Sequence, residues 1–245
     1  MTKRVYLSII VPAFNEETRL PSTLKATIDY LKRQEYSSEI VIVSDGSIDN
    51  TKEIAESFKE TFPKLVVIEY FPNYGKGYAV KMGMLKANGK YRLFMDADYA
   101  VPIEFVNKLM WRVRDGADIV IGSRGMSDSI IENHQGIFRE FLARVFGFIQ
   151  QFILILPISD TQCGFKLFTR NAADALFPQV RFNCAYFDAE LLYLAYKNRF
   201  NIAEVGVRWN HDGETRLPIG IKRSLELVRK LILIGYNHRS IKKLI

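Results

Sequence analysis

Cysteine is scarce in this sequence, which has only Cys163 and Cys184 among its 245 residues. Their separation matches no metal-ligand spacing, and two cysteines cannot form the disulfide framework of a small secreted domain. The sequence therefore favours a reducing compartment. Histidine is also rare, and because His134 and His211 lack the spacing of metal ligands, we expect them to be structural or loop residues.

The sequence also lacks a hydrophobic run long enough to cross a membrane. Val145–Leu156 carries no charge, but it contains two glutamines and falls short of the roughly 20 apolar residues of a spanning helix. We expect this stretch to lie in a membrane interface or in the core. The apolar segment after the basic N-terminus is too short for a signal peptide and has no small-residue cleavage site, so it is interpreted as a strand.

No internal repeat, low-complexity tract or Pro-, Gly- or Ser-rich linker interrupts the chain, which predicts one domain over residues 1–245. Hydrophobic residues make up 48% and charged residues 25% of the sequence, as in a folded globular protein. The formal net charge of +7 favours anionic partners: nucleotides, phosphates, nucleic acid or anionic lipid.

Strand-like and helix-like segments alternate through the first half. Apolar runs predict five buried strands, at Val5–Val11, Glu39–Ser44, Leu65–Tyr70, Tyr91–Met95 and Asp118–Gly122. The segments between them carry apolar residues at helical spacing. This alternation predicts an α/β fold, with a mostly parallel sheet flanked by helices on both faces. In such folds, ligands bind beyond the carboxyl ends of the strands.

Acidic residues follow three of these predicted strands. Asn15-Glu16 follows the first strand, Asp45 the second, and Asp96-Ala97-Asp98 the fourth. Two carboxylates one residue apart at a strand end point to the same side, where their repulsion would raise the pKa of one of them. A divalent cation such as Mg²⁺ or Mn²⁺ removes that conflict and can bridge to phosphate oxygens.

Two glycine-containing turns could approach a ligand closely. In Asp45-Gly46, a carboxylate that can accept hydrogen bonds from a base or a ribose precedes a residue that permits close backbone approach. Gly75-Lys76-Gly77 places a cation before a helix and resembles an anion-binding turn, but it lacks the Walker spacing.

Taken together, these motifs resemble the family 2 glycosyltransferases of GT-A fold. The match covers Ser8–Glu16, Ser44–Thr51, Asn73–Gly77 and Asp96–Asp98, in the family's order and spacing. Within the family, the chain is similar to the dolichyl-phosphate glucosyltransferases and mannose synthases, and Asp160–Phe168 is particularly similar to the glucosyltransferase branch.

The resemblance implies a role for each matching residue. The residues implied to bind the nucleotide sugar are Pro12, Ala13, Phe14, Asn15, Glu16, Asp45, Lys76, Asp96, Ala97, Asp98 and Arg216. Asp96 and Asp98 would hold a Mg²⁺ or Mn²⁺ cofactor. The residues implied to face the acceptor phosphate are Arg124, Arg139 and Gln162, and those implied to be catalytic are Asp188, Asp160 and Arg124. Residues 1–125 would form the donor half and residues 126–245 the acceptor half, which contains amphipathic interfacial helices.

The resemblance implies that a hexose is transferred, with inversion, from a nucleotide sugar to a polyprenyl or dolichyl phosphate. Glucose is the favoured hexose and UDP-glucose the favoured donor. Two alternatives stay open. The acceptor could be a sugar hydroxyl of a polysaccharide or glycolipid, which needs a general base and makes Asp188 the candidate. The chain could instead be a non-catalytic nucleotide- or nucleic-acid-binding module, but three acidic loops at one edge argue against nucleic acid, because carboxylates repel phosphate unless a metal intervenes.

The C-terminal segment from Ile221 is basic and amphipathic. Leu225, Val228 and Ile232 fall on one face, and lysines and arginines occupy the other. Such a helix suits anionic lipid, although a solvated surface helix has the same pattern. We therefore expect peripheral association with the cytoplasmic face of a membrane.

Overall fold

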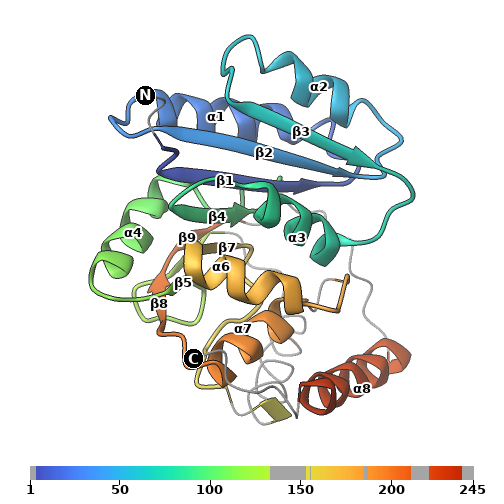
Figure 1. The fold of residues 1–245 in the computed structure, drawn as a ribbon. Coiled ribbons are helices and arrows are strands. Elements are labelled where there is room, and N and C mark those ends of the chain that lie inside the picture. Colours follow the sequence, from blue (N-terminus) through green and yellow to red (C-terminus); the bar gives the residue numbers. More distant parts are fainter. Residues whose placement is uncertain (1–3, 133–152, 155, 185–186, 211–220, 239–245) are drawn as a thin grey trace.

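The computed structural model describes residues 4–132, 153–154, 156–184, 187–210 and 221–238. A seven-stranded sheet forms its centre, and helices cover both faces of the sheet (Figure 1). Its strands are β1 (Leu7–Ala13), β2 (Ser38–Asp45), β3 (Leu65–Tyr70), β4 (Tyr91–Met95), β5 (Ile119–Ser123), β7 (Phe165–Thr169) and β8 (Ile202–Gly206). A small second sheet pairs β6 (Ile130–Ile131) with β9 (Arg208–Trp209).

The helices divide between the two faces of the sheet, and each face has its own apolar core. One core contains α1 (Leu20–Lys32), α2 (Thr51–Ser57), the 3₁₀ turn η1 (Ile103–Phe105) and α4 (Val106–Arg114). The other contains α3 (Lys76–Lys86), α6 (Arg170–Leu176), the 3₁₀ turn η2 (Phe177–Gln179), α7 (Phe187–Lys197) and α8 (Ile221–Asn237). Burial of strand side chains on both faces explains why the strands read as continuous apolar runs.

The predicted α/β fold with a mostly parallel sheet is confirmed, as is the single domain. The strand order is β3-β2-β1-β4-β7-β5-β8, and the neighbouring strands pair in parallel except where β7 is involved. β7 runs antiparallel to both β4 and β5. β4 and β5 were predicted from their apolar runs, but neither β7 nor β8 was predicted. Because β7 carries Lys166 inside its apolar run, the strand signal there is weak.

Two helices begin slightly later than their local sequences suggest, since Asp49 is a residue type that favours a helix N-cap and Pro102 one that favours the first helical turn. Asn50, and not Asp49, directly precedes α2, although Oδ1 of Asp49 still accepts the backbone N–H of Thr51 at 3.1 Å. Pro102 precedes η1, so α4 begins only at Val106. Both differences are shifts of a few residues at helix ends. There, side chains and short 3₁₀ turns form hydrogen bonds with backbone groups that have no partner inside the helix.

Most of the predicted 145–156 stretch, and the basic tail beyond residue 238, lie outside the described residues. Among the residues that the structure does describe, no helix combines the length and the apolar composition needed to cross a bilayer.

Candidate active site at the carboxyl edge of the sheet

Three polar segments meet at the carboxyl ends of adjacent parallel strands. β1 pairs in parallel with β2 on one side and with β4 on the other. Asn15, Asp45 and Asp96 follow or end these strands, so the topology brings them to one edge, as the sequence predicted. This edge is where a doubly wound sheet binds its ligand.

Asp96 is paired with a lysine. Its Oδ1 lies 2.5 Å from Nζ of Lys76, and both side chains keep partial solvent exposure. The backbone N–H of Asp96 donates to the carbonyl oxygen of Gly164 at 3.0 Å. A Cβ atom on Gly164 would collide with the Asp96 carboxylate, so only glycine leaves room for the acid there. Lys76 was predicted to lie near the nucleotide, and in the structure it forms an ion pair with Asp96.

Asp98 carries an electrostatic strain that a cation would relieve. Burial and the negative charge of Asp96 raise the pKa of Asp98, while Lys76 and Arg19 oppose that shift. Its Oδ1 accepts the backbone N–H of Ala100 at 3.1 Å. The loop is anchored to α1 because the Thr23 hydroxyl donates to the carbonyl oxygen of Ala97 at 2.6 Å.

Two neighbouring carboxylates with this conflict fit a divalent metal ion. Within the described part of the chain, no cluster of three or more His, Cys, Asp or Glu side chains gathers around a single point. Asp96 and Asp98 remain the predicted carboxylate ligands of a metal ion, and oxygen atoms from the substrate and water would complete the coordination.

Lys76 stays positively charged at this edge. Burial by itself would lower the pKa of Lys76, but the charges of Asp96, Asp188 and Asp98 outweigh it and raise the pKa. A lysine held charged beside two carboxylates provides a fixed positive charge that can face an anionic ligand.

Asp45 holds the turn that leads into α3. Its two carboxylate oxygens accept the backbone N–H groups of Tyr74 and Gly75, each at 2.8 Å. Gly46, with a φ of +69°, approaches the backbone of Asn73 so closely that a Cβ atom would collide with it. The residue predicted to bind the base thus lies at the expected edge and also shapes the Gly75–Gly77 turn. Its contact with a base remains a prediction.

The 12–16 loop binds the loop that follows β2. Oδ1 of Asn15 accepts the N–H of Ile48 at 2.9 Å, and the N–H of Asn15 donates to Oγ of Ser47 at 3.1 Å. The Glu16 carboxylate takes two 2.7 Å hydrogen bonds from Arg19. Pro12 and Ala13 are buried within β1, whereas the Phe14 side chain is 39% exposed. Phe14 is therefore the side chain of this loop that is best placed to contact a ligand.

Arg124 and Asp160 form a bidentate pair. Nε and one terminal nitrogen of Arg124 donate to the two Asp160 oxygens at 2.6 and 2.9 Å, and the backbone N–H of Arg124 adds a third bond at 3.0 Å. Burial alone would raise the pKa of Asp160, but Arg124 outweighs it and holds that pKa below its usual range. Gln162 joins the pair, because its N–H donates to Oδ1 of Asp160 at 3.0 Å.

Asp188 was predicted as a catalytic residue, and the structure places it in the first turn of α7, where it is buried. Its Oδ1 accepts a 2.6 Å hydrogen bond from Nζ of Lys166, which is itself fully buried and also donates to the carbonyl oxygen of Cys163. Burial raises the pKa of Asp188, and Lys166 and Lys76 oppose the shift. No role was predicted for Lys166, although a lysine within an apolar run was the available signal.

Two predicted phosphate-facing arginines, Arg139 and Arg216, lie outside the described residues. Cys163 and Cys184 are both free thiols. Their state matches the predicted absence of a disulfide framework.

A doubly wound sheet with paired acids and a lysine at its carboxyl edge is suited to binding a phosphate group together with a divalent cation. The family model for Glycosyl transferase family 2 matches residues 8–177. The chain belongs to this family, and the resemblance inferred from its motifs is confirmed.

Several curated relatives match nearly the whole chain. It is 41% identical over 249 residues to a dolichyl-phosphate beta-glucosyltransferase of Drosophila melanogaster, covering 95% of this chain and 75% of the relative. It is 37% identical over 247 residues to the enzyme of the same name from Dictyostelium discoideum, covering 96% and 75%. The Saccharomyces cerevisiae enzyme of that name is 33% identical over 255 residues, covering 95% and 75%.

Solved structures share the fold. Glucosyl-3-phosphoglycerate synthase from Mycobacterium tuberculosis, in complex with Mn²⁺, UDP and glucosyl-3-phosphoglycerate, superposes with a TM-score of 0.66 at 18% identity. The alignment covers 98% of this chain and 82% of the synthase. At that level of identity the comparison establishes the architecture, and it supports the GT-A fold class that the motifs implied.

Proposed function

We propose that this protein transfers glucose from UDP-glucose to dolichyl phosphate, with the help of a divalent metal ion. The arrangement of Asp96, Asp98 and Lys76 at the carboxyl edge of the sheet carries the proposal. Relatives of 33 to 41% identity are named dolichyl-phosphate beta-glucosyltransferases, which supports the sugar and the acceptor. Structures of the same fold contain UDP with Mn²⁺ or Mg²⁺, which supports the donor and the metal.

On the donor side, a metal ion bound by Asp96 and Asp98 would neutralise negative charge on the leaving diphosphate. Lys76, which is paired with Asp96, would add a fixed positive charge at the same edge of the sheet. The exposed Phe14 side chain and the Asp45 turn would border the nucleotide. The metal ion and Lys76 would stabilise the negative charge that develops as the bond between glucose C1 and the diphosphate oxygen breaks.

On the acceptor side, a phosphate oxygen of dolichyl phosphate would attack C1 from the opposite face, which inverts the anomeric centre. A phosphate monoester already carries negative charge at neutral pH, so the attacking oxygen needs no general base. The bidentate Arg124–Asp160 pair, to which the backbone N–H of Gln162 also donates, would orient Arg124 toward that phosphate. Arg139 is predicted to face the same phosphate. Asp188, buried against Lys166, would position the site and would not accept a proton.

We also propose that α8 lies on the cytoplasmic face of a membrane. Leu231 and Ile234 of this helix are buried, while Ile232, Leu233 and Tyr236 are 58%, 37% and 69% exposed. The helix therefore has a second apolar stripe directed away from the core, with the exposed Arg229 one turn away. Such a surface suits the boundary between acyl chains and anionic headgroups, where a lipid-linked acceptor resides.

The proposal is tested by incubating purified protein with dolichyl phosphate and a panel of radiolabelled nucleotide sugars, with Mg²⁺, Mn²⁺ or a chelator. We expect transfer of glucose from UDP-glucose, lost with the chelator. The Asp98→Asn variant should lose at least about 100-fold in kcat/KM, the scale of removing one charge-stabilising group. Asp118→Asn is the matched control, because Asp118 lies at the opposite end of β5 and caps the N–H of Asn201. Transfer of another sugar, or none, would refute the proposed reaction.

A further inference from the structure

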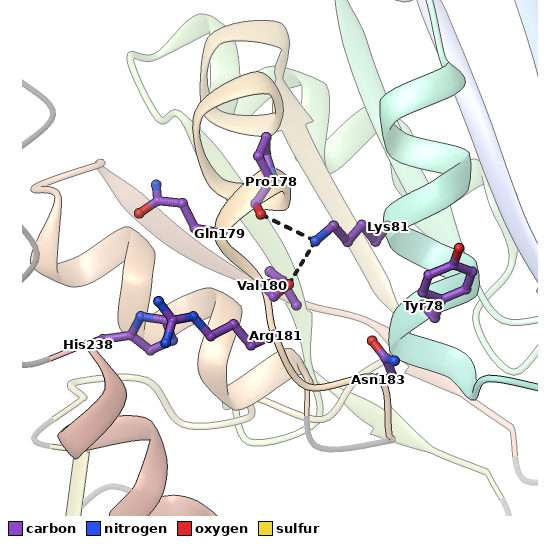
Figure 2. Close-up of a pocket in the computed structure, with 8 residues that line it drawn as sticks. All are labelled: Tyr78, Lys81, Pro178, Gln179, Val180, Arg181, Asn183 and His238. Atoms are coloured by element: carbon purple, nitrogen blue, oxygen red, sulfur yellow. Dashed lines mark hydrogen bonds between the residues drawn. The ribbon is translucent and has the colours of Figure 1, made fainter.

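A short segment that starts within η2 and runs toward α7, residues 178–183, is hydrogen-bonded to α3 on one side. Nζ of Lys81 donates to the carbonyl oxygens of Pro178 and Val180 at 3.2 and 2.9 Å (Figure 2). The carbonyl oxygen of Asn183 accepts the N–H of Gly77 at 2.8 Å. We refer to residues 178–183 as the strap. It borders an open pocket of about 520 Å³ that is also lined by Tyr78 and His238.

On its other side the strap is fastened to a buried carboxylate. Oε2 of Glu190, in α7, accepts the N–H groups of Arg181 and Phe182 at 2.9 and 2.8 Å. Oε1 of the same carboxylate lies 2.6 Å from Nε2 of His238, just beyond the end of α8. A carboxylate can only accept, so Nε2 of His238 is the donor. Glu190 thus joins the strap to α8.

Packing alone does not require a histidine at this place. Leu231, Ile234 and His238 are the buried positions at the end of α8, and their spacing puts them on one face of the helix. The two aliphatic side chains supply apolar contact that permits several orientations of the helix. A buried hydrogen bond between His238 and Glu190 is met in only one orientation, so it fixes where α8 sits.

The strap also touches the turn that carries the donor-site lysine. A Cβ atom on Gly75 would collide with the carbonyl oxygen of Asn183, and one on Gly77 with that of Phe182. The strap and the 75–77 turn are therefore in backbone-to-backbone contact. Lys76 lies in that turn and pairs with Asp96, and Asp45 accepts the N–H of Gly75. A shift of the strap would move these groups.

We propose that His238 is a positioning residue for the donor side of the site, acting through Glu190 and the strap on Lys76. The effect of His238 on UDP-glucose rests on the proposed function. Its effect on the backbone of the 75–77 turn does not, because amide hydrogen exchange can measure that effect without substrate. Through this connection, the position of α8 affects the positions of Lys76 and Asp45 at the carboxyl edge of the sheet.

Three variants of the full chain test the link. His238→Ala removes the donor to Glu190, and His238→Gln offers an amide N–H to the same carboxylate. Leu231→Ala is the matched control, since it weakens the packing of α8 but keeps both partners of the His238–Glu190 hydrogen bond. The measurements are the Tm, the Kd for UDP, the KM for UDP-glucose against kcat, and amide hydrogen exchange of residues 76–79.

We expect His238→Ala to raise both the Kd for UDP and the KM for UDP-glucose about tenfold, the scale of one lost hydrogen bond to a charged group. The same variant should increase the rate of amide hydrogen exchange at residues 76–79. His238→Gln should restore most of both. Leu231→Ala should lower the Tm while changing the Kd by less than about twofold. Equal effects of His238→Ala and Leu231→Ala, no effect of His238→Ala, or failure of His238→Gln to restore binding would each overturn the link. If the wild-type protein transfers no glucose, amide exchange still decides the link independently.

Discussion

Nζ of Lys166 lies 2.6 Å from Oδ1 of Asp188, and both side chains are buried. Lys166 belongs to β7, the antiparallel strand inserted between β4 and β5, and Asp188 belongs to the first turn of α7. The pair therefore ties the middle of the sheet to the helical layer beside it. Since the charge of Asp188 also acts on Lys76, this buried pair adjoins the donor side of the site.

Replacing Lys166 with methionine should strongly destabilise the fold. The substitution keeps the approximate volume but leaves the Asp188 carboxylate buried without its partner, which typically costs about 3–5 kcal/mol. Urea unfolding measures the loss. The double variant Lys166→Met, Asp188→Leu removes both charges and should recover most of the stability. A double variant no more stable than Lys166→Met would contradict this account.

Asp188→Asn should keep measurable glucose transfer to dolichyl phosphate. In the proposed reaction the attacking phosphate oxygen is already ionised, so no proton has to be removed. We expect kcat to fall less than about 100-fold, which is below the range of roughly 10²–10⁴-fold for losing a general base. The measurement is kcat with dolichyl phosphate at saturating UDP-glucose. Complete loss of turnover with a correctly folded protein would show that Asp188 does take a proton.

Acid should remove stability through Asp160. Because Arg124 lowers the folded-state pKa of Asp160 below its unfolded value, the carboxylate contributes stability above the unfolded pKa of about 3.9. That contribution is lost as the pH falls through the lower, folded-state pKa. Asp160→Asn should thus be less stable at neutral pH and lose less on acidification, measured as the free energy of unfolding across a pH series.

The control for this pH series is Asp29→Asn. Asp29 forms an exposed pair with Lys25 on α1, and such pairs contribute little. Its pH curve should follow the wild type. If Asp160→Asn also kept the wild-type acid response, the Arg124–Asp160 pair would not be the source of the pH dependence.

Asp45→Asn should weaken nucleotide binding. The amide retains one oxygen acceptor but presents N–H groups to one of the two backbone donors at Tyr74 and Gly75, so the turn before Lys76 loosens. We expect the Kd for UDP to rise about tenfold, since one hydrogen bond to a charged group is lost. Calorimetric titration with UDP measures it.

Asp115→Asn is the comparison for Asp45→Asn, because Asp115 pairs only loosely with Arg112, at 3.6 Å, in an exposed turn after α4. It should bind UDP as the wild type does. Equal affinities of the Asp45 variant and the wild type would mean that neither the turn nor the carboxylate takes part in binding.

Much of the donor half could be predicted from local pattern. β1, β2, β3, β4 and β5 were found within a few residues of their ends, because parallel strands buried on both faces have continuous apolar sequences. The convergence of Asp45 and Asp96 followed from the rule that parallel strands place their carboxyl ends at one edge. The pairing of Lys76 with Asp96 did not follow, since it depends on where α3 begins relative to β4.

β7 and the contacts it makes could not be predicted. An antiparallel strand between two parallel ones is specified by long-range pairing, and Lys166 interrupts its apolar pattern. The same holds for Glu190 and His238, which are 48 residues apart in sequence and meet only when α8 packs on α7.

The class of fold, the family and the edge of the sheet where the polar residues gather could all be inferred from the amino-acid sequence, because each depends on local periodicity and on motif order. Which charges are paired depends instead on the tertiary structure, which joins Lys76 to Asp96, Arg124 to Asp160 and Lys166 to Asp188. The physical reason is that a charge can be buried only beside its partner, and partners distant in the chain are brought together by packing.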